Sequence, residues 1–187
     1  MTDSPIEGHL LTPNDPHLVR RLRRLQDLGV GRRPDAEFDA FARTLAYDAR
    51  ELVSAPWPPH TMVNFVTNDQ YFAGLNIGGA PTGEPGVGRV MDKDHGYCPD
   101  VIDRGLPLVL DDVFDYPRYA GNEVVDEIGI RSYVGAPLID EPTGTILGTI
   151  CIVDTEPRSW GRPGLELITQ RAEEFMTRLQ QRENRRR

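Results

Sequence analysis

Residues 144–154, GTILGTICIVD, carry the pattern that decides the fold. Aliphatic and β-branched residues dominate this run, and successive side chains of a strand point to opposite faces. One face is apolar apart from a glycine: Ile146, Gly148, Ile150 and Ile152. The other face is mixed: Leu147, Thr149, Cys151 and Val153. We expect the first face to lie against helices, and Thr149 and Cys151 to line a cavity.

The preceding residues, 131–139, are expected to form the neighbouring strand, because turn residues 141–144 join the two runs. The same alternation gives a second cavity-side set: Arg131, Tyr133, Gly135, Pro137 and Ile139. Tyr133 is therefore predicted in the cavity wall. Glycine weakens a strand unless another group lies close to it. We expect a ligand or a packed side chain over Gly135, and tightly crossing helices at Gly148.

Residues 61–67 (TMVNFVT) and 70–77 (QYFAGLNI) also alternate, and the Asn68-Asp69 turn between them predicts a hairpin. Asn64 is the polar interruption in the first run. It assigns one set to the cavity side: Met62, Asn64 and Val66. The opposite assignment would place another set there: Thr61, Val63, Phe65 and Thr67.

Helical periodicity occupies both ends of the chain. An amphipathic segment precedes a second apolar stripe from about Pro34 to Val53, and the last helix is expected to begin near Pro163. The expected divisions are a flexible arm, an amphipathic helix, a domain and a basic tail: residues 1–15, 16–30, 33–180 and 181–187. This order predicts an α+β fold, with five to six antiparallel strands and the terminal helices on one face.

The stretch DKDHGYCPDVIDRG, residues 92–105, collects three chemically capable side chains: His95, Tyr97 and Cys98. Pro99 and Gly105 suit the start and end of a short helix, with Cys98 as its N-cap. A helix start lowers a cysteine pKa and nearby aspartates raise it, so a reactive thiol and a small packing residue both stay open. His95 is either a haem ligand or a hydrogen-bonded loop residue. Too few ligands accompany it for a metal-ion site.

The formal net charge is −8, and its sign varies along the chain. Arginines gather near the two ends: Arg20, Arg21, Arg23, Arg24, Arg182, Arg185, Arg186 and Arg187. Short charged runs are usually solvated, and the acidic middle argues against a nucleic-acid partner. Two cysteines without a CxxC pair favour a reduced, cytoplasmic protein. No apolar run approaches the ~20 residues of a membrane span.

Three motifs resemble those of a GAF domain, a small-molecule-sensing fold of signalling proteins, in its stand-alone bacterial form. They are GYCPDVIDRGLPLVLDDVFDYPRYAGN (96–122), IGIRSYVGAPLID (128–140) and GTILGTICIVDTEPRSWG (144–161). The resemblance implies terminal helices on one side of a sheet and a ligand cavity on the other, closed by segments between the second and fourth strands. It also implies dimerisation through the end helices. It identifies neither ligand nor cofactor.

The sequence departs from several GAF subclasses. Free methionine-R-sulfoxide reductases depend on lid cysteines and on acids on the cavity strands. Cys98 falls near one lid position, but PRYAGN (117–122), where the catalytic cysteine is expected, contains none. The positions matched to the acids hold Tyr133, Cys151 and Val153. The NKFDE pattern of cyclic-nucleotide GAF domains and the bilin-attachment pattern of phytochromes are absent.

Three functions are consistent with these features. The first is a sensory or regulatory module that binds a neutral or weakly anionic small molecule and signals to a protein partner as a homodimer. Its candidate ligand-binding residues are Asn64, His95, Tyr97, Cys98, Tyr133, Thr149 and Cys151, with no catalytic residue assigned. The second is a thiol-dependent redox enzyme in which Cys151 resolves Cys98. The third is a ligand-free dimerisation module whose cavity is filled by Tyr97, Tyr133 and Leu147.

Overall fold

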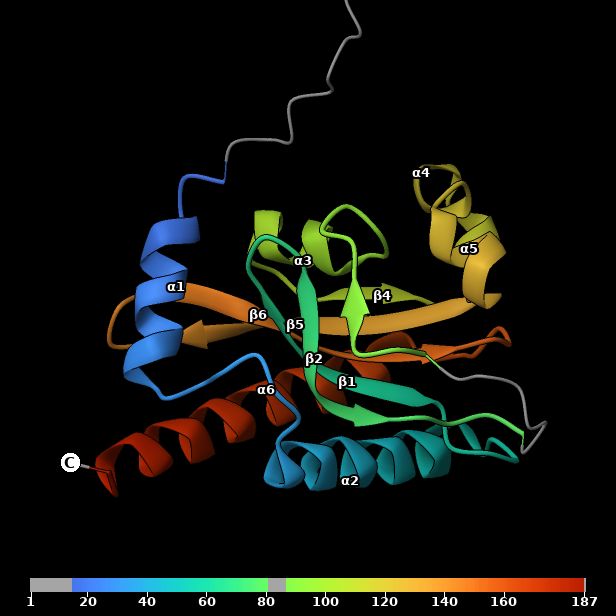
Figure 1. Cartoon of the computed structure of the whole chain (residues 1–187). Coiled ribbons are helices and arrows are strands. Elements are labelled where there is room, and N and C mark those ends of the chain that lie inside the picture. Colours follow the sequence, from blue (N-terminus) through green and yellow to red (C-terminus); the bar gives the residue numbers. More distant parts are fainter. Residues whose placement is uncertain (1–14, 81–86, 187) are drawn as a thin grey trace, which may run out of the picture.

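A computed structural model describes residues 15–80 and 87–186. Its strands form one antiparallel sheet in the order β3-β2-β1-β6-β5-β4 (Figure 1). The strands are β1 His60–Val66, β2 Gln70–Asn76, β3 Val90–Met91, β4 Leu108–Leu110, β5 Ser132–Asp140 and β6 Thr145–Asp154. The α+β prediction and both predicted hairpins are confirmed. The sixth strand, β3, completes the five to six that were predicted.

Two long helices, α2 (Ala36–Val53) and α6 (Gly161–Asn184), cover one face of the sheet, as predicted (Figure 1). The Asp35 side chain caps α2 by accepting hydrogen bonds from the backbone of the first turn. The two helices meet through Phe38 and Phe175, whose rings lie 5.0 Å apart and edge to face. The face beneath them is apolar: Val63, Phe65, Val134, Ala136, Ile150 and Ile152. Thr149 and Ile150 therefore face the sides that alternation assigned to them.

The N-terminal helix α1 (Leu18–Asp27) folds against its own sheet. Leu25 and Leu28 are buried there, together with two arginines, Arg21 and Arg24. Arg21 donates to the carbonyl oxygen of Ile146 at 2.7 Å. The prediction that this basic run is solvated was wrong for these two arginines, because the inner face of α1 meets carboxylates and free carbonyls that pair with them.

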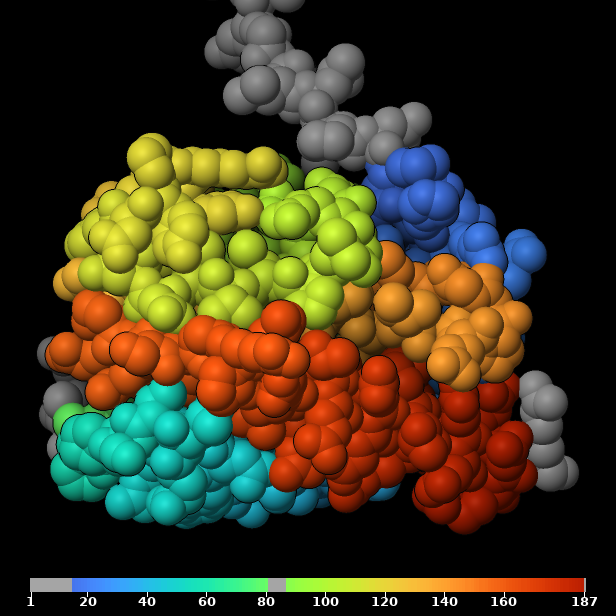
Figure 2. Space-filling view, turned by 180° about the vertical axis from the view of Figure 1, so that it is seen from behind, coloured from blue at the N-terminus to red at the C-terminus, as the bar shows by residue number. Residues whose placement is uncertain are grey.

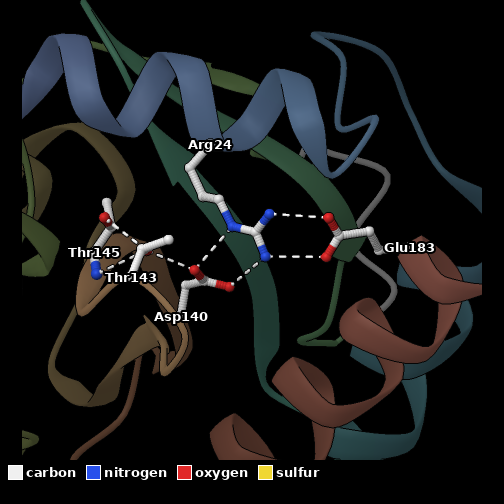
Figure 3. Close-up of polar contacts among 5 residues, drawn as sticks. All are labelled: Arg24, Asp140, Thr143, Thr145 and Glu183. Carbon is white, nitrogen blue, oxygen red and sulfur yellow. Dashed lines mark hydrogen bonds and ion pairs between the residues drawn. The ribbon is translucent and has the colours of Figure 1, made fainter.

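A buried ion network joins α1 to two distant parts of the chain (Figure 3). Arg24 pairs with Asp140 at 2.8 Å and with Glu183 at 3.0 Å. Asp140 ends β5 and also accepts a 2.6 Å hydrogen bond from the Thr143 hydroxyl. Figure 2 shows from behind the segments that this network joins: the blue surface of α1 lies beside the orange β5–β6 turn and above the dark red end of α6.

Two of the C-terminal arginines, Arg182 and Arg186, are also paired, and Arg187 lies outside the described residues. Residues 181–184 continue α6, and Arg182 pairs with Asp35 at 2.7 Å. Arg186 donates to the carbonyl oxygen of Leu28 at 3.1 Å. Four of the basic residues near the chain ends, Arg21, Arg24, Arg182 and Arg186, therefore fasten the terminal helices to one another and to the sheet.

The opposite face of the sheet is covered by short helices and loops, residues 92–107 and 111–130, which we call the cover. It contains α3 (Cys98–Arg104), the single 3-10 turn η1 (Val113–Asp115), α4 (Pro117–Ala120) and α5 (Glu123–Ile128). Its apolar side chains form a second core with this face. The predicted helix that ends at Gly105 is confirmed, with Gly105 in the left-handed conformation (φ 62°).

A β-bulge reverses one part of the predicted alternation. Leu138 pairs with Gly148 and Ile139 with Ile146, so Leu147 has no partner in β5. As a result Leu147 joins the helix-side core, and Ile146 lies next to Gly105 on the cover side. The assignments of Ile146 and Leu147 were wrong because an extra residue shifts the period of two, which sequence alternation alone does not reveal. Leu147 therefore does not fill the cavity side.

Candidate functional site

The candidate site lies between the centre of the sheet and the cover. β1 and β6 pair here, with Met62 opposite Cys151 and Asn64 opposite Thr149. Met62 and Asn64 both occupy the cover side, as predicted, because Val63 and Phe65 belong to the other core. Six predicted residues come together in this region: Asn64, Tyr97, Cys98, Tyr133, Thr149 and Cys151. Cys98 belongs to the cover, and its sulfur contacts Tyr133 and Cys151 of the sheet.

A polar row crosses the floor of the site. Asn64 donates from Nδ2 to Oε1 of Gln70 at 2.9 Å and toward the Thr149 hydroxyl at 3.5 Å. Gln70 in turn donates from Nε2 to the carbonyl oxygens of Asp92 (2.8 Å) and His95 (2.6 Å). Because Nε2 is committed to two acceptors, Oε1 must face Asn64, and Asn64 must present its amide nitrogen.

This orientation leaves Oδ1 of Asn64 without a hydrogen bond to any described residue, although Asn64 is fully buried. Among described side chains, two other buried polar atoms share this property: Trp160 Nε1 and Arg171 Nε. Those two belong to the helix-side core and to α6. A buried acceptor without a donor costs about 1–3 kcal/mol. Asn64 Oδ1 is therefore the unsatisfied acceptor of the candidate site.

The two cysteines lie in contact beside this row. Cys98 and Cys151 are free and buried, and their Sγ atoms are 3.8 Å apart. Cys98 Sγ also lies 3.3 Å from the Tyr133 hydroxyl, and Cys151 Sγ lies 3.7 Å from Met62 Sδ. Hydrogen bonding from Cys151 lowers the pKa of Cys98 to about 6, outweighing the opposite effect of burial. The pKa of Cys151 is raised by its hydrogen bond with Cys98, by burial and by the negative charge of an ionised Cys98 beside it.

Tyr133 explains the glycine at 135. A Cβ on Gly135 would lie 2.1 Å from the Tyr133 hydroxyl, so the tyrosine side chain itself lies over this glycine. Of the two expected occupants, the packed side chain is therefore the one found. A Cβ on Gly148 would lie 1.8 Å from the backbone oxygen of Asn64. The expectation of crossing helices at Gly148 was wrong, because the neighbouring strand β1 makes the close approach.

Hydrogen bonds hold the cover together above the thiols. Asn122 accepts from the backbone nitrogen of Gly96 at 3.0 Å and donates to its oxygen at 2.9 Å. The Tyr97 hydroxyl donates to the carbonyl oxygen of Tyr119 at 3.1 Å, and burial raises the pKa of Tyr97 to about 12. The Tyr97 ring meets the Tyr133 ring edge to face at 5.2 Å. The cover thus rests on the sheet through aromatic and thiol contacts.

The helix start at Cys98 differs by one residue from the prediction. Tyr97 is the N-cap of α3, and Cys98 is its first helical residue.

The His95 side chain lies away from the thiols, 3.6 Å from Glu127 and 3.8 Å from Asp92, and only its carbonyl oxygen joins the polar row. Over residues 15–80 and 87–186, no cluster of three or more histidine, cysteine or acidic side chains is placed to hold a metal ion.

The space enclosed at the site is small. Its volume is about 30 Å³, which is room for two or three water molecules at about 10–15 Å³ each. Its walls are Met62, Gln70, Phe72, Val87, Met91, Gly96, Tyr97, Cys98, Val124, Ile128, Ile130, Tyr133 and Val153. Drug-sized ligands occupy about 300–1,000 Å³. The structure therefore shows this side in a closed form, with Tyr97 and Tyr133 filling most of it.

A wider groove of about 600 Å³ lies between the start of α1 and the end of α3. Several of its cations are already paired: Arg21 and Lys93 with Asp15, and Arg104 with Asp100. It holds neither the thiols nor the unsatisfied acceptor. We therefore place the candidate site on the sheet face, where those groups meet, although the groove is larger.

Sequence reasoning missed two residues that organise the site, Gln70 and Asn122. Gln70 directly follows the predicted Asn68-Asp69 turn, and Asn122 caps α5 through Val124. An asparagine before a helical run is a recognisable capping signal. Its second role, holding Gly96, depends on how the cover folds back on itself.

The comparisons with known proteins agree with this architecture. The family model described as GAF domain matches residues 37–179. The chain belongs to the GAF domain family. No curated protein matches it. No described helix is long and apolar enough to cross a membrane.

Solved structures with the same fold are distant in sequence. Free methionine-R-sulfoxide reductase from Neisseria meningitidis, in complex with its substrate, has a TM-score of 0.55 and 15% identity, covering 89% of each chain. The GAF domain of an Acinetobacter phosphoenolpyruvate-protein phosphotransferase has a TM-score of 0.55 and 12% identity, covering 88% of this chain and 93% of that one.

The chromophore-binding domain of bacteriophytochrome RpBphP3 from R. palustris has a TM-score of 0.59 and 10% identity, covering 91% of this chain and 61% of that one. At these identities the three likenesses establish the GAF fold and do not identify a ligand.

Proposed function

We propose that this GAF domain is a sensory or regulatory module that binds a small molecule on the cover side of its sheet. The observation that supports this most is Asn64 Oδ1, a buried acceptor without a donor, fixed in orientation by the Gln70 bonds. Buried polar atoms are nearly always hydrogen-bonded, so an unsatisfied one in the middle of a sheet marks a place for a partner.

The walls define the chemistry of the ligand. No aspartate, glutamate, lysine or arginine borders the enclosed space. A charged ligand would lose its hydration without gaining an opposite charge, so a neutral molecule fits best. Asn64 itself does not border that space, so once the cover has moved the ligand needs an N–H or O–H group to reach Asn64 Oδ1 and an apolar body to contact Met62, Phe72 and Tyr133. The neisserial reductase and the phytochrome domain named above are precedents for ligands held by this fold.

Binding requires the cover to move, because the space below the closed cover holds only two or three water molecules, at about 10–15 Å³ each. The bonds that must yield are those of Asn122 with Gly96 and of Tyr97 with Tyr119. Displacement of α3 would reach β6 through Cys98 and Cys151. The Arg24 network then offers a route from the β5–β6 hairpin to α1 and α6. We propose these terminal helices as the output surface toward a second copy or a signalling protein.

A metabolite screen by thermal shift tests this function, because a ligand that binds only the folded state raises the melting temperature. We expect a neutral hydrogen-bond donor to raise it in the wild-type chain. The shift should be lost in Asn64→Ala and retained in Val63→Ala, which alters the same strand on its other face. Asn122→Ala, which loosens the cover, is screened in parallel. Absence of any shift in both wild type and Asn122→Ala would contradict the proposal.

A second candidate is a ligand-free dimerisation module, favoured by the small volume that Tyr97 and Tyr133 leave. The outer face of α1 exposes 70% of Val19 and 42% of Leu22, which is a natural contact surface. Sedimentation of the full chain and of Leu22→Glu tests it, with Arg20→Glu as a control for added charge. A dimer that Leu22→Glu dissociates, combined with a failed ligand screen, would favour this function over sensing.

A further inference from the structure

The ligand-binding proposal uses the two buried thiols only as a packing contact between α3 and β6 and gives them no chemical role. Cys98 is 5% exposed at the first residue of α3, and Cys151 is 2% exposed in the middle of β6. They are 53 residues apart in sequence and 3.8 Å apart at Sγ. A disulfide requires about 2.05 Å, so the sulfurs must approach by roughly 1.8 Å. A rotation of Cys98 with a small shift of α3 supplies such a movement.

The surroundings assign different roles to the two sulfurs. Cys98 borders the enclosed space, and Cys151 does not. Cys98 also has the Tyr133 hydroxyl at 3.3 Å, a donor that stabilises a thiolate. The lowered pKa of Cys98 and the raised pKa of Cys151 agree with this division. Cys98 is therefore the thiol that meets an incoming reagent, and Cys151 is its resolving partner.

The size of the space selects the oxidant. While the cover is closed, about 30 Å³ leaves room for a molecule of two or three heavy atoms, whereas an aromatic or peptide disulfide enters only when the cover opens. Hydrogen peroxide is the smallest hydroperoxide and is uncharged, which suits walls without ionised side chains.

We propose that Cys98 and Cys151 are a peroxide-sensing pair, whose disulfide fastens α3 to β6 and locks the cover of the sensor. This inference deepens the proposed function and rests on it, since the disulfide would make ligand exchange depend on redox state. In the reduced chain the cover is held by hydrogen bonds and packing. In the oxidised chain a covalent bond is added at the residue where α3 begins.

The chemistry balances with peroxide as the only co-reactant. The Cys98 thiolate attacks one peroxide oxygen; an S–O bond forms, the O–O bond breaks, and the departing hydroxide takes a proton to become water. The product is the Cys98 sulfenic acid. The Cys151 sulfur, after losing its proton, attacks the Cys98 sulfur; an S–S bond forms and the S–O bond breaks, releasing a second water. Two thiols are oxidised by two electrons in total, and one peroxide is reduced by two.

The test begins with the reduced full chain and equimolar hydrogen peroxide, without any ligand. We expect the intact mass to fall by two hydrogens and peptide mapping to show a 98–151 link. Cys151→Ser should stop at a sulfenic acid that dimedone traps at Cys98. Cys98→Ser should stay unmodified under the same conditions. Cys98→Ala and Cys151→Ala repeat both arms in case a serine hydroxyl disturbs the buried site.

Access is measured with an aromatic disulfide reagent. We expect both thiols to resist it in the folded chain and to react in urea, whereas peroxide oxidises the folded chain. No 98–151 link under peroxide that oxidises free cysteine, or equal peroxide reactivity of Cys98 and Cys151, would overturn the proposal and leave the pair as packing residues.

The two proposals fail separately. If the disulfide forms and no ligand is found, small-molecule sensing is wrong and the thiol pair stands by itself. If a ligand is found, its dissociation rate should be at least tenfold slower from the oxidised chain than from the reduced one. An unchanged rate would show that the disulfide does not lock the cover. The Cys151→Ser variant, which cannot form the bond, should release the ligand at one rate before and after peroxide.

Discussion

The two faces of the sheet are built in different ways. On the helix side, α2 and α6 bury aromatic and aliphatic side chains against apolar strand residues. On the cover side, four short elements rest on the sheet, and the core there contains two thiols, two tyrosines and a neighbouring row of amides. Long helices with complete apolar stripes give stability that depends little on any single polar bond. The cover depends on individual hydrogen bonds, which can be exchanged for a ligand.

This difference separates the part of the molecule that holds the fold from the part that can respond. Local opening is easiest where few apolar contacts hold an element and its hydrogen bonds are made by loops. The cover meets the second condition through Asn122, Tyr97 and Tyr119, although its apolar side chains also form a core with the sheet. Substitutions on each face, followed by unfolding and hydrogen-exchange measurements, test whether stability and response are divided between the two faces.

The largest effect should come from the helix side. Phe175 contacts both Phe38 and Phe41, with ring centroids 5.0 and 5.3 Å away. Phe175→Ala should lower the free energy of unfolding by about 3–5 kcal/mol, because it leaves a cavity in a close-packed core. Urea denaturation measures the change. Tyr47→Ala, at a 53% exposed position of α2, should have little effect. A small loss for Phe175→Ala would contradict the assignment of stability to this face.

The Arg24 network should give the second-largest effect. Asp140→Asn should lower the free energy of unfolding at pH 7 by about 3 kcal/mol, because it leaves a buried arginine with one carboxylate fewer. Burial alone would raise the pKa of Asp140, but hydrogen bonds from Arg24 and Thr143 outweigh it and the net pKa is lowered. The stabilisation is therefore complete above the unfolded pKa, about 3.9, and disappears as pH falls through the lower folded value. Urea midpoints of the wild type and the variant should converge below about pH 4; parallel curves would show that Asp140 is not the titrating group.

Sequence alternation predicted that Tyr133, Thr149 and Cys151 lie on the side of the sheet away from the long helices. The prediction holds because strands without irregularities keep a period of two. It failed at Leu147, where the bulge adds one residue that composition does not reveal. The prediction from charge also failed for Arg21 and Arg24. An arginine on a helix is expected to be solvated unless a partner distant in sequence is known, and for Arg24 that partner is Asp140. The closed volume depends on side-chain packing of the whole cover and has no local sequence signal.

Alanine substitutions at Gly135 and Gly148 compare two kinds of close contact. A side chain, Tyr133, lies over Gly135, and the backbone of β1 lies against Gly148. Gly135→Ala should cost about 1–3 kcal/mol by overpacking against the Tyr133 hydroxyl. Tyr133→Leu should recover part of that loss in the double variant, because a shorter side chain no longer lies over residue 135. Gly148→Ala clashes with the Asn64 backbone oxygen, so truncating Asn64 to alanine should recover nothing. Thermal unfolding of the six variants, four single and two double, measures this. Additive losses at 135 and 133 would contradict the packing of Tyr133 over Gly135.

Asn122→Ala should have the smallest effect on stability and the largest effect on opening of the cover. Asn122→Ala removes two hydrogen bonds to Gly96 and should lower the free energy of unfolding by only about 1–2 kcal/mol. Hydrogen exchange should nevertheless become faster over residues 96–104, while α2 and α6 keep their protection. Thr177→Ala, an exposed helix-side position with a comparable side-chain bond to Glu173, serves as the matched control. Faster exchange spread evenly over both faces would mean that the cover and the helices open together, and that response is not confined to the cover.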